Sequence, residues 1–298
     1  MKRRIMPAVA VLMTAVLNAG AYFNGGLGQT FGRHNYRGTS GYLIIGSENG
    51  LWLRPSLSFY KSDIVKGKYK TYAVRGGYDA AAYGISAEAG ATPKEDGYGN
   101  RFAAADITFS LSSSGGKKSR IAGPQSGGGA ARGKGLAGVD VGAGIRHTAH
   151  TDELNALRAI RPSEAAIGQT DLLVFAGAKF LSTNVSGQYT KSGYDKTLSG
   201  GYRVSQRTAL AGMTAIIQGF PSQSWNFRAE WASMPVVRPF FSYTHTQFKL
   251  SQPNSDSYAA GASVGLDMLQ LNGTAEVYDP GGGAEKENFF SLGAALRF

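Results

Sequence analysis

The feature that most constrains the fold of this chain is an alternation of apolar and polar residues with a period of two. The clearest case is Ser224–Ala232, which reads SWNFRAEWA. Successive side chains of an extended strand point to opposite faces. One face of this segment therefore carries Trp and Phe side chains, whereas the other carries the opposite charges of Arg228 and Glu230. The pattern predicts a β-strand with one apolar face and one polar face.

Similar alternation recurs along most of the chain and predicts an all-β fold. No amphipathic helix of useful length stands out, and Thr151–Ile160 is only a weak candidate. The composition agrees, because glycine accounts for 42 of 298 residues and there are 15 Tyr and 15 Phe. The other alternating segments are Gly41–Gly46, Leu51–Tyr60, Lys70–Tyr78, Ala82–Ala91, Arg101–Leu111, Leu136–Arg146, Asp171–Phe180, Asn184–Thr190, Thr208–Ile217, Val237–Phe248, Tyr258–Asp267, Gln270–Tyr278 and Phe290–Phe298.

Residues 1–21 have the features of a cleavable signal peptide. Three basic residues, Lys2 to Arg4, precede the apolar run Ala8–Leu17, and the small residues Ala19–Ala21 follow it. We expect cleavage after Ala21, which leaves 22–298 as the mature chain. Cysteine is absent, so disulfide bonds and thiolate metal sites are excluded.

The exported chain combines alternating segments with the absence of any apolar run long enough for a transmembrane helix. A sheet crosses a bilayer only as a closed barrel, because every backbone amide must be paired inside the protein. Aromatic residues near both ends of the apolar faces, such as Trp225 and Trp231, fit the interfacial girdles of such barrels. We expect a transmembrane antiparallel up-and-down β-barrel over 22–298 with about 12 strands, within a range of about 10 to 14.

The last nine residues, Phe290–Phe298, place Phe290, Leu292, Leu296 and Phe298 on one face of a strand. This ending resembles the terminal strand of bacterial outer-membrane β-barrel proteins. The resemblance implies a cell outer membrane location, and it implies that these four residues form the signal for the barrel-assembly machinery. Counting strands back from Phe298 places the connections at 279–288 and 249–257 outside the cell.

Charged residues at inward positions are balanced. A balanced interior fits two readings that the sequence leaves open: an ion-pair network that fills a narrow lumen, or the charged walls of a small pore. The basic members are Arg54, Arg75, Arg146, Arg228, Arg238 and Arg297, and the acidic members are Glu88, Asp106, Asp140, Glu230, Asp267 and Glu276.

One connection, 112–135, is rich in glycine and serine and has five basic residues but no acid. We expect a flexible basic loop that is attracted to anionic lipopolysaccharide by long-range electrostatics. The alternative is a solvated loop without a partner. Its basic residues are Lys117, Lys118, Arg120, Arg132 and Lys134.

The sequence contains no convincing motif for catalysis or metal binding. Trp225 and Asn226 resemble a pair in the outer-membrane phospholipase family, but Gly212 and Thr214 stand where that family has its His and Ser. His147 and His150 lie near Asp152 and Glu153 in an expected loop, where such residues are more often solvated than metal-bound. We therefore expect no enzyme activity, no metal site and no cofactor. His245 has no carboxylate nearby in the sequence.

The functional hypothesis is a passive porin-like channel for small solutes, with outer-membrane lipid and lipopolysaccharide as surroundings and no nucleic-acid partner. The alternative is a non-conducting structural or surface-interaction barrel. The chain is also similar to the autotransporter β-domain, which has twelve strands and ends in an aromatic residue, but a passenger segment is missing between Ala21 and the first alternating segment.

Overall fold

The computed structural model describes residues 21–63, 65–95, 98–112, 120–124, 137–153, 164–198, 205–210, 213–231, 236–266 and 268–297. Within these ranges, no helix is long and apolar enough to cross a membrane. The strands are β1 (Ala21–Gly32), β2 (Tyr36–Ser47), β3 (Leu51–Ser62), β4 (Val65–Asp79), β5 (Tyr83–Glu95), β6 (Tyr98–Ser112), β7 (Ala137–Glu153), β8 (Glu164–Phe180), β9 (Thr183–Tyr194), β10 (Ser205–Leu210), β11 (Met213–Gln218), β12 (Pro221–Trp231), β13 (Val237–Phe248), β14 (Ser255–Leu266), β15 (Leu269–Asp279) and β16 (Glu287–Arg297).

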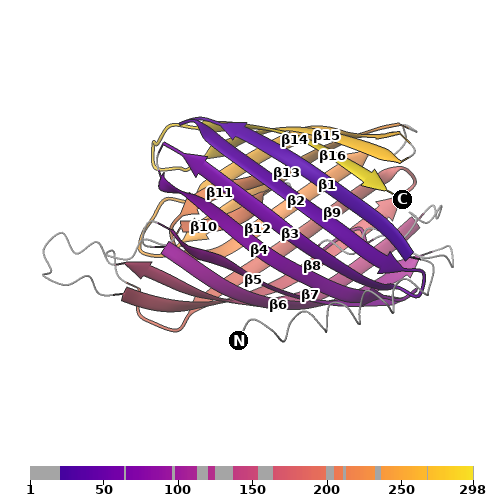
Figure 1. Ribbon diagram of the computed structural model, residues 1–298, viewed down its shortest axis with the longest axis horizontal. Helices are drawn as coiled ribbons and strands as arrows, with labels where there is room; N and C mark the ends of the chain where they lie inside the picture. The colour runs from indigo at the N-terminus through magenta and orange to yellow at the C-terminus, as the bar shows by residue number, and fades with distance from the viewer. Residues whose placement is uncertain are drawn as a thin grey trace, which may run out of the picture.

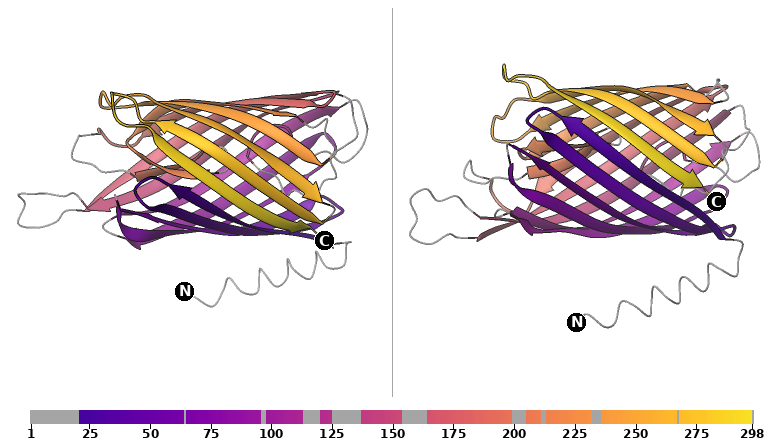
Figure 2. Two further views of the ribbon diagram at one scale, coloured as in Figure 1. Left: turned by 90° about the horizontal axis from the view of Figure 1, so that it is seen from above. Right: turned by 45° about the horizontal axis from the view of Figure 1, so that its top comes forward.

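Fourteen of these strands form a closed antiparallel barrel (Figure 1). Strands that follow one another in the sequence are paired around the wall, except that β9 pairs directly with β12. The strands β10 and β11 form a separate two-stranded hairpin. β1 pairs with β16 over nine residue pairs, and the Thr30 and Ser291 hydroxyls share a hydrogen bond of 2.6 Å. Because β1 and β16 are joined, the wall has no free edge strand (Figure 2).

The all-β barrel predicted from the alternation is confirmed, and its fourteen strands are at the upper end of the expected range. Two strand assignments were wrong. β1 was not predicted, because glycines at positions 25, 26, 28 and 32 obscure its alternation. Thr208–Ile217 was predicted as one wall strand, but its described residues belong to the two six-residue strands β10 and β11.

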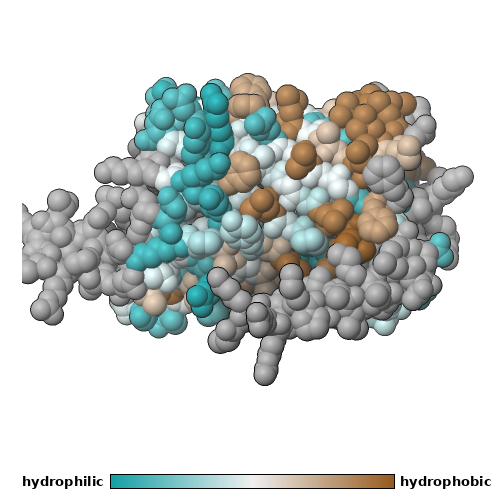
Figure 3. Space-filling model, viewed as in Figure 1, coloured by the Kyte–Doolittle hydropathy of each residue, from teal (hydrophilic) through white to brown (hydrophobic). Residues whose placement is uncertain are grey.

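The outer face of the barrel is apolar, and the inner face is polar. Figure 3 shows hydrophobic residues gathered over part of one outer side. Exposed outward side chains include Leu27, Tyr72, Val74, Ile85, Ile107, Phe109, Val141, Leu172, Val174, Trp231, Phe241, Phe290, Leu292 and Leu296. Buried inward ones include Ser86, Asp106, Thr108, Ser110, Asp140, Thr148, Ser242, Thr244 and Ser257. An apolar outside and a polar inside are the arrangement of a barrel that stands in lipid.

The two ends of the barrel differ in their connections. We call the end at which β1 begins and β16 finishes the terminal end, and the other the distal end (Figure 2). The connections at 280–286, 249–254 and 195–220 lie at the distal end. The connection from β6 to β7, which contains the predicted basic loop, lies at the terminal end, because β6 runs toward that end.

The predicted assembly signal lies on β16. Phe290, Leu292 and Leu296 point outward and are exposed, as the alternation predicts, whereas Phe298 lies outside the described residues. Of the predicted signal peptide, only Ala21 is within the described residues, where it begins β1.

Replacing Leu292 by arginine should impair insertion of the barrel, because this side chain is 66% exposed on the outer face near the middle of β16. An arginine facing lipid near mid-bilayer costs about 2–4 kcal/mol. The heat-modifiable fraction of membrane protein on SDS gels measures insertion. Asn272→Arg is the matched control, since Asn272 is the inward neighbour of Gly293 on β15. Equal insertion of the two variants would contradict the assignment of the faces.

Candidate functional site in the barrel lumen

A row of charged residues crosses the inner wall from β3 to β8. The strand register aligns Arg54 with Arg75, Arg75 with Glu88, and Arg146 with Asp171. Ala104 of β6 fills the position between Glu88 and Arg146. The row exists because each strand contributes its polar face to the interior at the same register. The lumen is therefore lined by fixed charges of both signs.

Arg75 is the centre of this row. Its side chain is buried, and it forms ion pairs with Glu88, at 3.2 Å, and with Asp106. It also donates a hydrogen bond of 2.6 Å to the Ser86 hydroxyl, which donates in turn to Asp106 at 2.6 Å. Glu88 and Ser86 lie on β5, whereas Asp106 lies on β6, so Arg75 of β4 reaches across one whole strand. The network ties three strands together on the lumen side.

A short segment of the β6–β7 connection, Arg120–Pro124, packs against this wall. Arg120 donates to Asp106 and to Asp79, each at 3.0 Å. The backbone N–H of Ile121 donates to the Asp140 carboxylate, and the next residue, Ala122, is buried. These acids are on β6, β4 and β7, so one side of the lumen wall holds the segment. The segment narrows the barrel toward its terminal end.

Glycines on the wall make room for the segment. A Cβ atom at Gly177 of β8 would lie 2.8 Å from the Ala122 Cβ and 2.9 Å from the Ile121 Cγ2, closer than real side chains approach. Gly123 has a φ of +86° and lies against the Phe175 ring, so the turn suits glycine alone. Strand and segment are thus complementary in shape as well as in charge.

This arrangement differs from the flexible basic loop expected at 112–135. Arg120 is not solvated but buried between two carboxylates. Asp79 was not identified from the sequence, because it lies just after the alternating segment Lys70–Tyr78 and no sequence pattern connects it with Arg120. Ser112 is the last residue of β6. The other predicted basic residues, Lys117, Lys118, Arg132 and Lys134, lie outside the described residues.

The opposite wall carries a second charged group on β12–β15. Arg228 forms an ion pair of 3.3 Å with Glu230 and stacks over the Phe240 ring, 3.8 Å from its centroid. Arg238 of β13 lies on the inward side beside Ser263. On β15, Glu276 is buried and accepts a hydrogen bond from Ser257. Because the Arg228 side chain is one-third exposed, the lumen retains accessible charge on this side.

Ring stacking holds two further arginines of the inner wall. Arg54 lies over the Tyr42 ring at 4.6 Å, and Arg146 lies over the Phe102 ring at 3.9 Å. The sequence predicted balanced charges but no such stacking. A guanidinium that lies flat on a ring is attracted to the ring face and keeps its N–H groups at the edge available.

Aromatic rings form a belt on the inner wall near the distal end. The Tyr60 and Tyr69 rings are stacked with centroids 5.2 Å apart, and the Tyr36 and Phe289 rings meet edge to face at 5.3 Å. All members are buried, so the rings fill this part of the wall. The belt consists of Phe289, Tyr36, Tyr60, Tyr69, Tyr98 and His150.

The histidines considered as metal ligands lie on opposite faces of β7, which extends into the expected loop as far as Glu153. His147 is exposed on the outer side and contacts Thr170, whereas His150 is buried and contacts Tyr98 and Gln169. Within the described residues no cluster of three or more potential metal ligands occurs. Cross-strand pairing brings Asp256 to 2.8 Å from His245. The sequence did not indicate this contact, because the two residues are eleven positions apart.

Comparisons with solved structures show the same fold. CdiB from Acinetobacter baumannii superposes with a TM-score of 0.52 and 11% identity over 93% of this chain, which spans 60% of that protein. The CymD monoaromatic hydrocarbon channel superposes with a TM-score of 0.53 and 9% identity, and the match covers 94% of this chain and 89% of the channel. No protein-family model and no curated protein sequence matches the chain. The chain therefore has the fold of bacterial outer-membrane β-barrels, as the sequence resemblance predicted.

Proposed function

We propose that this protein is a passive channel for small polar solutes in the bacterial outer membrane. The observation that carries the proposal is a closed barrel with an apolar outer face and a charged inner wall, against which Arg120–Pro124 packs. Side chains would fill a barrel of about eight strands, whereas about sixteen leave an aqueous channel, so fourteen strands leave room for a pore with a local constriction. The structural likeness to outer-membrane channels supports this class of function.

The charges of the lumen favour solutes without a strong net charge. Most of the acids named above are already neutralised: Glu88 and Asp106 by Arg75, Asp79 by Arg120 and Glu230 by Arg228. Compensated walls give little electrostatic preference for either sign of ion. Small sugars and similar polar molecules are the solute class that fits. No catalytic step and no cofactor enters this proposal.

The proposal includes an orientation. The terminal end faces the periplasm and the distal end faces outside, as in bacterial barrels with short periplasmic turns. The signal peptide at 1–21 exports the chain, and the barrel-assembly machinery recognises the β16 signal. The constriction formed by Arg120–Pro124 then lies at the periplasmic side of the pore, and the aromatic belt lies at its outer side.

Planar-bilayer recording of the refolded protein tests the proposal. We expect discrete openings with weak preference between potassium and chloride, and uptake of neutral sugars in a liposome-swelling assay. The absence of openings, also in a variant whose constriction is released, would contradict the channel. That outcome would favour a non-conducting structural barrel, for which the buried belt at Tyr36, Tyr60 and Tyr69 is the supporting observation.

A further inference from the structure

The outer face near the distal end carries a row that changes from aromatic to basic along one register. Phe290 of β16 is aligned with Phe31 of β1, Phe31 with Arg37 of β2, and Arg37 with Lys61 of β3. All four side chains are exposed and stand on the outward side of their strands. Two apolar rings and two cations are therefore neighbours on the surface that meets lipid.

The two cations are directly opposed across the strands and carry like charge. Neither Arg37 nor Lys61 has an ion-pair or hydrogen-bond partner in the described part of the chain. Like charges at directly opposite positions destabilise a sheet unless an anion lies between them. β2 and β3 contain no acid, and β4 has only Asp79, at the terminal end. Asp63, in the turn after β3, accepts a hydrogen bond from Asn35 and forms no ion pair with Arg37 or Lys61 in the described part of the chain.

Two more lysines extend the positive surface onto β4. Lys70 is aligned with Phe59, two residues from Lys61, and Lys68 lies over the Phe59 ring, 4.4 Å from its centroid. Both lysines are exposed. Figure 3 shows a stripe of hydrophilic residues on this side of the barrel, toward the distal end. We call Arg37, Lys61, Lys68 and Lys70 the basic cluster.

The surface on the terminal side of the basic cluster is apolar. Leu57, Tyr72 and Val74 are exposed there, on the same faces of β3 and β4 that carry the lysines. An amphiphile with anionic groups at the cluster would lay its hydrocarbon along these side chains. A free polyanion would gain nothing from them.

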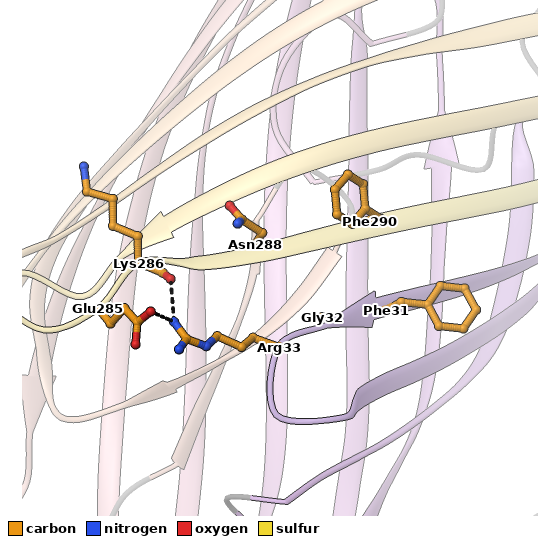
Figure 4. A pocket seen from close by; sticks show the side chains of 7 residues that line it. All are labelled: Phe31, Gly32, Arg33, Glu285, Lys286, Asn288 and Phe290. Carbon is orange, nitrogen blue, oxygen red and sulfur yellow. Dashed lines mark hydrogen bonds and ion pairs between the residues drawn. The ribbon is translucent and has the colours of Figure 1, made fainter.

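A groove at the β1–β16 seam adjoins the cluster and has a volume of about 460 Å³ (Figure 4). Phe31 and Phe290 line it, and Arg33 borders it from the turn after β1. Glu285 forms an ion pair with Arg33, whose hydrogen bond lowers the pKa of Glu285, so this acid stays ionised. Lys286 is likewise paired with an acid, Asp279 at 3.1 Å. Among the described residues around the groove and the basic cluster, the cations without an ion-pair partner are those of the cluster.

From these features we infer that the basic cluster and the adjoining seam groove bind lipopolysaccharide in the outer leaflet. A lipid phosphate lies between Arg37 and Lys61 and removes their repulsion, while an acyl chain follows the Phe31 and Phe290 rings. This inference rests on the proposed outer-membrane orientation but not on conduction. It assigns the lipid contact expected from the sequence to strands β1–β4 and β16 instead of the loop at 112–135.

A double variant, Arg37→Gln/Lys61→Gln, tests the site in the refolded full-length barrel. Native mass spectrometry in detergent measures retention of purified lipopolysaccharide. We expect about thirtyfold weaker binding, since each basic residue at an anionic membrane surface contributes about a factor of five. The matched control, Arg101→Gln/Lys191→Gln, removes two exposed outward charges from β6 and β9 and should bind as the wild type does. Equal losses in both variants would overturn the site.

The lipid itself is the second arm of the experiment. Dephosphorylated lipopolysaccharide should bind the wild type as weakly as it binds the double variant, and phosphatidylglycerol should bind less tightly than lipopolysaccharide. Wild-type binding that survives dephosphorylation, or that is tighter for phosphatidylglycerol, would overturn the inference.

The unfolding midpoint distinguishes lipid binding by Arg37 from a purely structural role of this residue. In zwitterionic detergent, Arg37→Gln should raise the unfolding midpoint, because it relieves the repulsion with Lys61. With lipopolysaccharide present, the same variant should unfold at a lower temperature than the wild type, because it loses bound ligand. A shift of the same sign in both media would contradict the site. Conductance should be unchanged, which separates this test from that of the channel.

Discussion

Replacing Arg120 by alanine should increase the single-channel conductance by about twofold and shift the ion preference toward cations. Arg120 holds the Arg120–Pro124 segment to the wall through Asp79 and Asp106, so its removal releases the constriction. Asp79 then has no arginine beside it, while Asp106 keeps Arg75, and the narrow zone gains net negative charge. Planar-bilayer recording in a potassium chloride gradient measures the conductance and the reversal potential.

Gly177→Val separates the steric effect from the charge effect. Its side chain would occupy the space of Ile121 and Ala122, so it should raise the conductance without shifting the reversal potential. Arg101→Ala removes an outward charge and should leave both quantities unchanged. If the Arg120 and Gly177 variants conduct like the wild type, Arg120–Pro124 does not limit the pore.

Replacing Arg75 by methionine should lower the free energy of unfolding by about 3–5 kcal/mol, because it leaves Glu88 without its arginine and leaves Asp106 with Arg120 alone. The Arg75 side chain is 9% exposed, and those of Asp106 and Glu88 are 3% and 21% exposed, so solvent screens the pairs weakly. Urea unfolding of the barrel in lipid vesicles, followed by tryptophan fluorescence, measures the change.

The double variant Arg75→Met/Glu88→Gln is the internal comparison for this prediction. Neutralising Glu88 removes the carboxylate charge that has lost its arginine, so the double variant should recover part of the lost stability. A single variant as stable as the wild type would mean that water in the lumen already screens these charges.

The alternation in the sequence was sufficient to predict the wall of the barrel, since a period of two determines which side chains face lipid. Trp231, Ile107 and Leu292 lie on the outer face for this reason. β1 was not predicted because its glycines have no side chain that could show an apolar or a polar face. Thr208–Ile217 was wrongly predicted as a wall strand, because the sequence of a short hairpin alternates in the same way as that of a wall strand.

The contacts inside the lumen could not be predicted in the same way. Arg75 and Asp106 are on strands separated by β5, and the long arginine side chain reaches across β5 to the carboxylate, a contact that no spacing in the sequence indicates. Arg120 lies in a segment whose glycine- and serine-rich composition is typical of solvated loops. Its burial depends on Asp79 and Gly177, which are distant in the sequence and have no recognisable pattern.

The direct pairing of β9 with β12 has a consequence for how this chain can vary. The wall closes without using any residue between Tyr194 and Pro221, because nine residue pairs already join the two strands. Strand pairing around the barrel therefore sets no length for the chain between Leu198 and Phe220, whereas Asp195, Leu198 and Phe220 themselves contact the wall. In the proposed orientation, a foreign peptide inserted between Leu198 and Phe220 would be displayed at the cell surface.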